Sequence, residues 1–280
     1  MQKPYIAVFD SGIGGMSVLS QLIKTMPKES FIYFGDNDNA PYGSKTQREL
    51  LELMVSNVAS VISFGVKVVV IACNTVSTTI FHQLSYYFPN VKFFGIFPPV
   101  EINLLHKRKT LLLCTPNTAK NYKASKYLTV LPLKDLAGEI ERKMYDLQLV
   151  EVEKNLKEAV ALYCKNSIDH NDRAKCLNLP TQNMKMIVDH RLSHFDVVIL
   201  GCTHYFFVKE KIYDHFRPQV ILGGENFTAR KVKVFLESSK SLAKTKQNQI
   251  IFYGNNAFLN ASFFEKTFPN LKNIKKILKK

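Results

Sequence analysis

The sequence predicts an α/β protein with two lobes, each built on a mostly parallel sheet flanked by helices. Short apolar runs alternate along the chain with segments of helical periodicity, as in strands joined by helical crossovers. Two of the runs, residues 66–72 and 197–200, are rich in β-branched residues and end close to a cysteine. The alternation starts afresh near residue 98, so a second lobe is expected to begin there.

The expected strands are short runs of Val, Ile, Leu and aromatic residues, a composition typical of strands buried on both faces of a parallel sheet. In chain order they are residues 5–9, 31–34, 66–72, 91–96, 109–114, 128–131, 197–200, 220–222 and 250–253.

Helical spacing follows most of these strands. Residues 45–64 are the clearest case, because Leu50, Met54, Val58 and Val61 fall on one helix face. Further helices are expected from residue 16, over 76–88, from about 119, from 135, over 150–176, over 186–192, after strand 220–222 and in the closing basic segment 272–280.

The restart divides the chain into two lobes with no linker between them. We expect residues 1–97 plus about 210–280 to form the first lobe, and residues 98–209 to form the second. Ligands of open α/β sheets bind at the carboxyl ends of the strands. The active site is therefore expected in the cleft between the lobes.

The composition indicates a soluble, globular, cytoplasmic protein. Of its 280 residues 46% are hydrophobic, and no apolar run is long enough to span a membrane. The amino terminus does not resemble a signal peptide. The five cysteines form no CxxC pair, which favours free thiols in a reducing compartment.

The net charge is +15, with 38 basic and 23 acidic residues. A nucleic-acid-binding protein would gather this charge in a stripe or patch. Apart from the closing segment the lysines are scattered, so we expect a basic surface with neither a specific nucleic-acid partner nor a membrane partner.

Two cysteines occupy unusual positions. Cys73 follows strand 66–72 and precedes Asn74, while Cys202 follows strand 197–200 and precedes Thr203 and His204. Buried cysteines usually act as small hydrophobic residues, and we interpret Cys114, Cys164 and Cys176 in this way. The polar neighbours of the other two thiols suggest chemistry.

Three kinds of chemistry fit a thiol at a strand end. Metal binding needs three or four ligands, and the segment from Cys202 to His204 offers at most two. A hydrolase would use one cysteine with a histidine base, which leaves Cys73 without a role. Two facing thiols use both cysteines, because one can take a proton from a carbon while the other returns a proton to the opposite face.

Thiols need assistance for this reaction. A free thiol has a pKa of about 8.5, so little thiolate is present at neutral pH. Asp10, which ends the first strand, and His204 are the natural helpers, one beside each cysteine. Ser11, Asn74, Thr75 and Thr203 can donate hydrogen bonds to substrate carboxylates.

The chain resembles the glutamate racemases of the cofactor-independent aspartate/glutamate racemase superfamily. Four motifs carry the resemblance, and a fifth, GENFTAR at 224–230, matches more weakly. They occur in the family order and span nearly the whole chain. The four are FDSGIGG at 9–15, GD…PYG at 35–43, ACNT at 72–75 and LGCTHY at 200–205.

The resemblance implies two pseudo-symmetric lobes that hold glutamate between them, with no cofactor and no metal. It implies that Cys73 deprotonates D-glutamate and that Cys202 deprotonates L-glutamate, with Asp10 and His204 as helpers. Glu141 resembles the acid that the family places in the second lobe. The implied substrate-binding residues are Asp10, Ser11, Pro41, Tyr42, Gly43, Asn74, Thr75, Thr118, Thr203 and His204.

The sequence departs from the family pattern at the rim of the expected cleft. Residues 37–39 lack the usual basic or small side chains, and Phe206 stands where proline is usual. Neither departure touches the thiols.

We therefore expect a bacterial isomerase that interconverts L- and D-glutamate by a two-thiol mechanism and supplies D-glutamate for peptidoglycan, and hence for cell-wall biogenesis and cell shape. A homodimer is the expected assembly. The alternatives are an aspartate racemase of the same superfamily and a non-catalytic basic binding protein on this scaffold.

Overall fold

A computed structural model describes residues 5–145, 150–152, 154–156, 158–159, 195–244, 249–271 and 274–278. The expected helix at 186–192, together with Cys164 and Cys176, lies outside these residues. Within them, no helix is long and apolar enough to cross a membrane.

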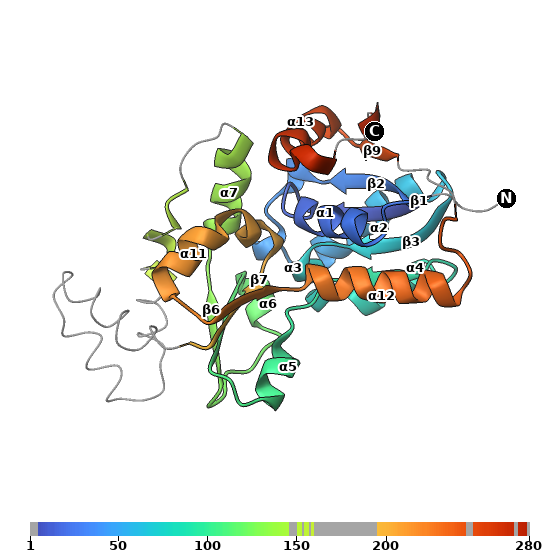
Figure 1. Cartoon of the computed structure of the whole chain (residues 1–280). Coiled ribbons are helices and arrows are strands. Elements are labelled where there is room, and N and C mark those ends of the chain that lie inside the picture. The colour runs from blue at the N-terminus through green and yellow to red at the C-terminus, as the bar shows by residue number, and fades with distance from the viewer. Residues whose placement is uncertain are drawn as a thin grey trace, which may run out of the picture.

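The described residues form two parallel sheets, one in each lobe (Figure 1). The first has the order β10-β9-β2-β1-β3-β4 and the second the order β6-β5-β7-β8. Strands of the first sheet are β1 (Tyr5–Asp10), β2 (Ser30–Gly35), β3 (Val66–Ile71), β4 (Phe93–Gly95), β9 (Ile250–Tyr253) and β10 (Ile274–Leu278). Strands of the second sheet are β5 (Thr110–Cys114), β6 (Leu128–Pro132), β7 (Val197–Gly201) and β8 (Val220–Gly223).

Helices cover the sheets, as their apolar faces require. Their bounds are α1 (Met16–Thr25), α2 (Gln47–Ile62), α3 (Asn74–Thr79), α4 (Phe81–Tyr87), α5 (Val100–Leu105), α6 (Pro116–Ala119), α7 (Leu136–Tyr145), α11 (Lys209–Phe216), α12 (Glu225–Ser238) and α13 (Ala257–Thr267). Short 3-10 turns are η1 (Asn37–Asn39), η2 (Tyr42–Ser44), η3 (Thr203–Val208) and η4 (Pro269–Leu271).

The core explains why these segments fold together. One apolar cluster joins both lobes, since it contains Val8 of β1 as well as Leu113 of β5 and Leu200 of β7. Smaller clusters cover the other face of each sheet. The lobes therefore share a continuous core rather than two separate ones.

Within the described residues, the chain crosses between the lobes at two adjacent places, residues 96–99 and the turn at Gly223 and Gly224. These crossings pack closely, because a Cβ atom on Gly224 would lie 2.6 Å from Ile96 Cγ1 and 2.6 Å from the carbonyl oxygen of Phe97. Both ends of the described chain consequently lie in the first lobe, where blue and red ribbons meet in Figure 1.

Two expectations about the second half of the chain are wrong. The second sheet extends past the expected boundary at residue 209, because β8 pairs in parallel with β7. The basic segment expected to be a helix contains strand β10, which pairs in parallel with β9. In both cases parallel pairing with the preceding strand, across an intervening helix, decides the outcome, and local spacing does not reveal it.

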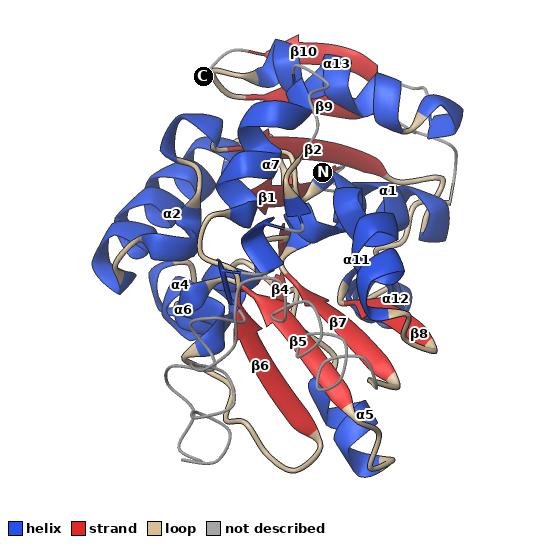
Figure 2. Cartoon of the chain, turned by 90° about the vertical axis from the view of Figure 1, so that its left-hand side faces the viewer, coloured by secondary structure: helices blue, strands red, loops and turns tan. Residues whose placement is uncertain are grey.

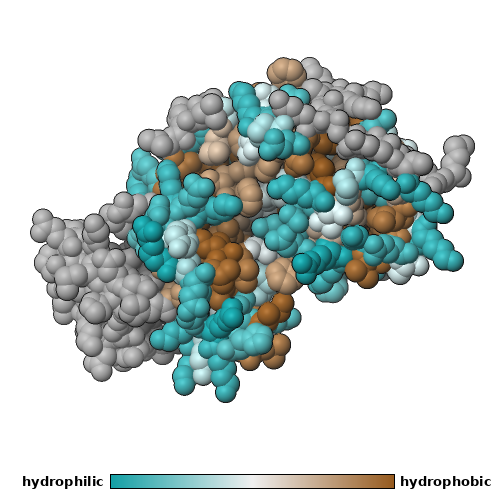
Figure 3. Space-filling model, in the orientation of Figure 1, coloured by the Kyte–Doolittle hydropathy of each residue, from teal (hydrophilic) through white to brown (hydrophobic). Residues whose placement is uncertain are grey.

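Hydrophilic side chains are interspersed with apolar ones on the face drawn in Figure 3 rather than gathered in a single stripe.

Candidate active site

The two sheets bring their carboxyl ends toward one another, and a thiol stands at each. Cys73 follows β3 and precedes α3, while Cys202 directly follows β7. In Figure 2, β6, β5 and β7 lie side by side with their carboxyl ends toward the first lobe. Both thiols are free and buried, and both line the same cavity.

This cavity is small and polar. Its volume is about 10 Å³, which is room for about one water molecule. Ten predicted site residues line it, together with Thr115 and Ala137. The ten are Ser11, Pro41, Tyr42, Gly43, Cys73, Asn74, Thr75, Cys202, Thr203 and His204.

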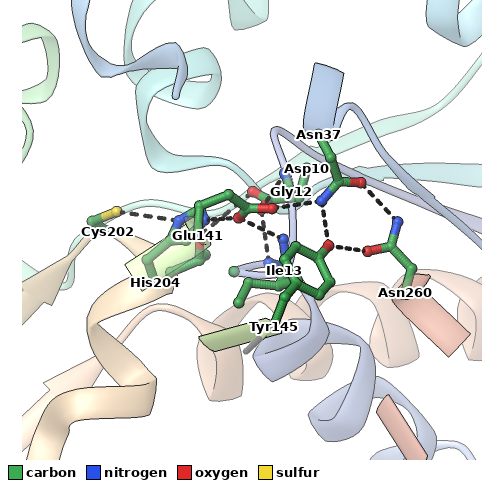
Figure 4. Close-up of polar contacts among 12 residues, drawn as sticks. Asp10, Gly12, Ile13, Asn37, Glu141, Tyr145, Cys202, His204 and Asn260 are labelled. Carbon is green, nitrogen blue, oxygen red and sulfur yellow. Dashed lines mark hydrogen bonds and ion pairs between the residues drawn. The ribbon is translucent and has the colours of Figure 1, made fainter. Parts of the chain in front are cut away.

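A hydrogen-bonded series supports Cys202 (Figure 4). The Nδ1 atom of His204 lies 3.8 Å from the Cys202 sulfur, and its Nε2 atom lies 2.6 Å from Oε2 of Glu141. Glu141 is on α7, so this carboxylate comes from the second lobe. Burial opposes charge on the imidazole, but contacts with Cys202 and Glu141 together raise the pKa of His204 well above its ordinary value. The geometry therefore favours an imidazolium beside this thiol.

Asp10 occupies the corresponding place near Cys73 but does not line the cavity. Its Oδ2 atom accepts hydrogen bonds from the backbone N–H groups of Gly15 at 2.9 Å and Gly12 at 3.2 Å. Thr203 donates its hydroxyl to Oδ1 at 3.4 Å. Burial raises the pKa of Asp10 from 3.8 to about 6, so this carboxyl titrates close to neutral pH.

Burial also raises the pKa of the Cys73 thiol, and the charge of Asp10 adds to this effect. Backbone N–H groups of Val76 and Thr75, at the start of α3, act in the opposite direction. Cys73 therefore rests as a neutral thiol. To act as a base it needs a neighbour that accepts its proton, and Asp10 is chemically suited to this.

The side chain of Asn74, on the cavity wall, makes no hydrogen bond to the described residues. Both side-chain polar atoms of Asn74 are buried without a hydrogen-bond partner among the described residues. Such orphaned groups are rare in folded proteins and mark places where a ligand or water completes the bonding. Asn74 therefore presents a free donor and a free acceptor to whatever occupies the cavity.

A hydroxyl cluster lies on the same wall. Thr75 Oγ1 and Thr115 Oγ1 are 2.9 Å apart, and Thr115 donates its hydroxyl to Thr118 at 3.1 Å. Thr118 was expected to line the site, but it is fully buried behind Thr115. The sequence reasoning missed Thr115, although it immediately follows β5 and occupies the same strand-end position as the predicted residues.

The loop that holds Pro41, Tyr42 and Gly43 against the cavity is fixed from behind. Tyr42 donates its hydroxyl to Oδ2 of Asp36, which also accepts a hydrogen bond from Asn57 of α2 at 3.1 Å. A larger cavity of about 410 Å³ lies on that side of the loop, near Asp36 and α2, and neither thiol lines it. Across the described residues, no group of three or more His, Cys, Asp or Glu side chains is placed to hold a metal ion.

Comparison with known proteins finds relatives that match over most of the chain. A glutamate racemase from Clostridium novyi is 34% identical over 247 residues, which cover 86% of each chain. One from Clostridium botulinum is 32% identical over 273 residues, covering 93% of each. The chain belongs to the glutamate racemase family.

The fold agrees with this membership. The crystal structure of a glutamate racemase from Francisella tularensis, in complex with D-glutamate, has a TM-score of 0.71 at 21% identity and covers 99% of this chain and 97% of its own. No family model matches the sequence. The resemblance recognised from the motifs and the predicted two-lobed α/β fold are thus confirmed, while the roles of individual residues stay predictions.

Proposed function

We propose that this protein is a glutamate racemase of the two-thiol type. The observation that carries the proposal is the shared cavity, which places Cys73 and Cys202 on the walls of one polar space, each delivered by a different sheet. Relatives that are about one third identical over most of the chain and carry the name glutamate racemase support glutamate as the substrate.

The reaction follows from two acids or bases on opposite faces of one carbon. From L-glutamate, the thiolate of Cys202 takes the α-proton, and the electron pair of the broken C–H bond passes into the carboxylate as an enolate. The thiol of Cys73 then gives its proton to the other face, which yields D-glutamate. From D-glutamate the roles are reversed, and proton exchange with solvent restores the starting state.

The surroundings favour the charged intermediate. Asn74, Thr75 and Thr203 lie on the cavity wall, where their side chains can donate hydrogen bonds to the carboxylates of the substrate. An imidazolium at His204 stabilises the negative charge that develops near Cys202. The cavity is smaller than glutamate, so its walls must move apart to admit the substrate.

Cysteine variants test the proposal. Circular dichroism follows the conversion of L-glutamate to D-glutamate by purified protein without added cofactor. Cys73→Ala and Cys202→Ala should each lower the rate by about 100- to 10,000-fold, because each removes one acid–base group. Cys114→Ala is the matched control, since this buried thiol does not line the cavity.

Two results would contradict the proposal. One is a near wild-type rate in either Cys73→Ala or Cys202→Ala. The other is faster turnover of aspartate than of glutamate, which would instead assign the aspartate racemase activity of the superfamily.

The biological setting forms part of the proposal. The product, D-glutamate, would enter peptidoglycan synthesis in a bacterial cytoplasm, with the protein acting as a homodimer. Light scattering during size-exclusion chromatography tests the assembly, and a mass near that of one chain of 32.0 kDa would contradict it. Depletion of the gene product should create a requirement for D-glutamate.

A further inference from the structure

Three side chains form a closed hydrogen-bonded cycle behind Glu141 (Figure 4). Asn37 Nδ2 donates to the Tyr145 hydroxyl oxygen at 2.5 Å, and that hydroxyl donates to Asn260 Oδ1 at 2.8 Å. Asn260 Nδ2 completes the cycle by donating to Asn37 Oδ1 at 2.9 Å. We refer to these three residues as the amide–phenol cycle.

The Glu141 carboxylate fixes the direction of the Asn37 amide, and with it the direction of the cycle. Its oxygen accepts from Asn260, and one of its two N–H bonds points to Tyr145. The other N–H bond is donated to Oε1 of Glu141 at 2.5 Å. A flipped amide would set its oxygen against the Glu141 carboxylate, so Asn37 is a donor to this acid, and the cycle holds its side chain in place.

Glu141 connects Asn37 to His204 through its two carboxylate oxygens. Its other oxygen, Oε2, accepts from the backbone N–H of Ile13 at 2.9 Å and lies 2.6 Å from Nε2 of His204. Both carboxylate oxygens are therefore engaged, and the carboxylate plane is set. The opposite ring nitrogen of His204 faces Cys202 at 3.8 Å.

The cycle joins the two lobes. Asn37 follows β2 and Asn260 lies on α13, both in the first lobe, while Tyr145 ends α7, between the second-lobe strands β6 and β7. Asn260 is almost completely buried. On the other side of the cavity, Asp10 accepts hydrogen bonds from the backbone N–H groups of Gly12 and Gly15 and from the Thr203 hydroxyl. Among the described residues, the hydrogen bond that leaves the cycle goes to Glu141, the partner of His204.

We propose that the amide–phenol cycle is a positioning device for one half of the reaction. It orients Glu141 so that His204 faces Cys202, and it thereby acts on proton transfer at Cys202 and not at Cys73. This inference rests on the proposed two-thiol racemisation. It assigns a role to Asn37, at the start of the loop where the sequence departs from the family pattern.

Isotope effects distinguish positioning from general structural support. The test uses the full chain carrying Asn37→Ala, with L-glutamate and D-glutamate each deuterated at the α-carbon. Slower transfer at Cys202 makes that step more rate-limiting. The isotope effect on kcat/KM should therefore rise for deuterated L-glutamate and fall toward one for deuterated D-glutamate. The rate in both directions should drop by roughly 10- to 100-fold.

Two further variants complete the experiment. Tyr145→Phe removes only a hydroxyl and should shift the two isotope effects in the same opposite directions, which keeps the test open if Asn37→Ala folds poorly. Asn255→Ala is the matched control, since Asn255 is exposed and hydrogen-bonds Asp38 rather than Glu141. It should leave both isotope effects at the wild-type values.

Unchanged isotope effects in both Asn37→Ala and Tyr145→Phe would overturn the inference, as would equal changes for the two enantiomers. Failure of the proposed function is separate, because it would be seen in the wild-type protein as absent racemisation or in the cysteine variants as retained activity.

Discussion

Asp10 is a single residue whose ionised form is destabilised by burial in the folded protein. Its carboxyl group is buried, and its pKa in the folded protein is about 6, compared with 3.8 as the ordinary value. The folded state therefore binds the proton more tightly than the unfolded state does. The contribution of Asp10 to stability falls as the pH rises from about 4 through 6, and it is constant above that.

Asp10→Asn should remove this pH-dependent penalty. The free energy of unfolding of the variant, relative to that of the wild type, should rise by about 2 kcal/mol between pH 4 and pH 7, which is most of the effect of a shift of about two pKa units. Urea denaturation at several pH values measures this difference. Asp10→Asn also alters the hydrogen bonds to Gly12 and Gly15. This changes the free energy of unfolding by the same amount at every pH, so it does not affect the change with pH. A difference that does not vary with pH would contradict the assignment.

Single residues differ in how far the sequence predicts them. Cys73 and Asn74 follow a β-branched run directly, so strand-end logic places them at the sheet edge. The contacts of Asn37 have no such signal, because its partners Glu141 and Asn260 are 104 and 223 residues away along the chain. Hydrogen bonds over such separations follow from the assembled fold and leave no mark in local spacing.

At the scale of an element, the turn from β1 to α1 packs closely against Thr203 and His204. A Cβ atom on Gly14 would lie 2.5 Å from Oγ1 of Thr203 and 2.6 Å from Nδ1 of His204, so only glycine lets this turn approach the second lobe. The backbone of Gly14 is not left-handed, so alanine would introduce a contact problem rather than backbone strain.

Gly14→Ala should therefore damage the site more than the fold. We expect a loss of roughly 100-fold in racemisation, since a displacement of about 1 Å of an acid–base group has that effect. Thermal melting monitored by circular dichroism should stay a single cooperative transition. Wild-type turnover in a folded variant would show that the two lobes adjust to the extra carbon without disturbing His204.

The sequence predicted the central strands better than it predicted the structure of the closing segment. Buried β-branched runs predicted β1, β3 and β7 because a parallel sheet buries both faces of a strand. The closing segment with β10 has an irregular pattern of lysine and isoleucine that resembles an exposed helix face. Its pairing beside β9, at the sheet edge, is compatible with such lysines because edge strands often carry charge.

At the scale of the whole molecule, a buried ion pair and the cysteine of the site lie at opposite ends of the strands of the first sheet. Lys67, at the amino end of β3, lies 2.8 Å from Oε2 of Glu29 and donates to the carbonyl oxygen of Ser241 at 2.9 Å. Glu29 also accepts the N–H of Ala243 at 2.7 Å. Only 5% of the Lys67 side chain and 1% of the Glu29 side chain are exposed, so removal of one partner leaves a buried charge.

Lys67→Met should lower the free energy of unfolding by about 3–5 kcal/mol, because Glu29 would remain charged and unpaired. Below the melting temperature, kcat and KM should be those of the wild type, since Cys73 lies at the other end of the strand. Adding Glu29→Gln should recover part of the stability by removing the orphaned charge. No recovery in the double variant would mean that packing of the lysine stem, and not the ion pair, accounts for the loss.

The two adjacent crossings between the lobes also impose an order on biosynthesis. A nascent chain that has emerged through β8 already contains Cys73, Cys202 and the four strands of the second sheet. It still lacks α12, α13, β9 and β10. The outer edge of β2 is then unpaired, and Asn37 has no Asn260 to accept from. The first sheet is therefore completed only after the segments that follow β8 have been synthesised.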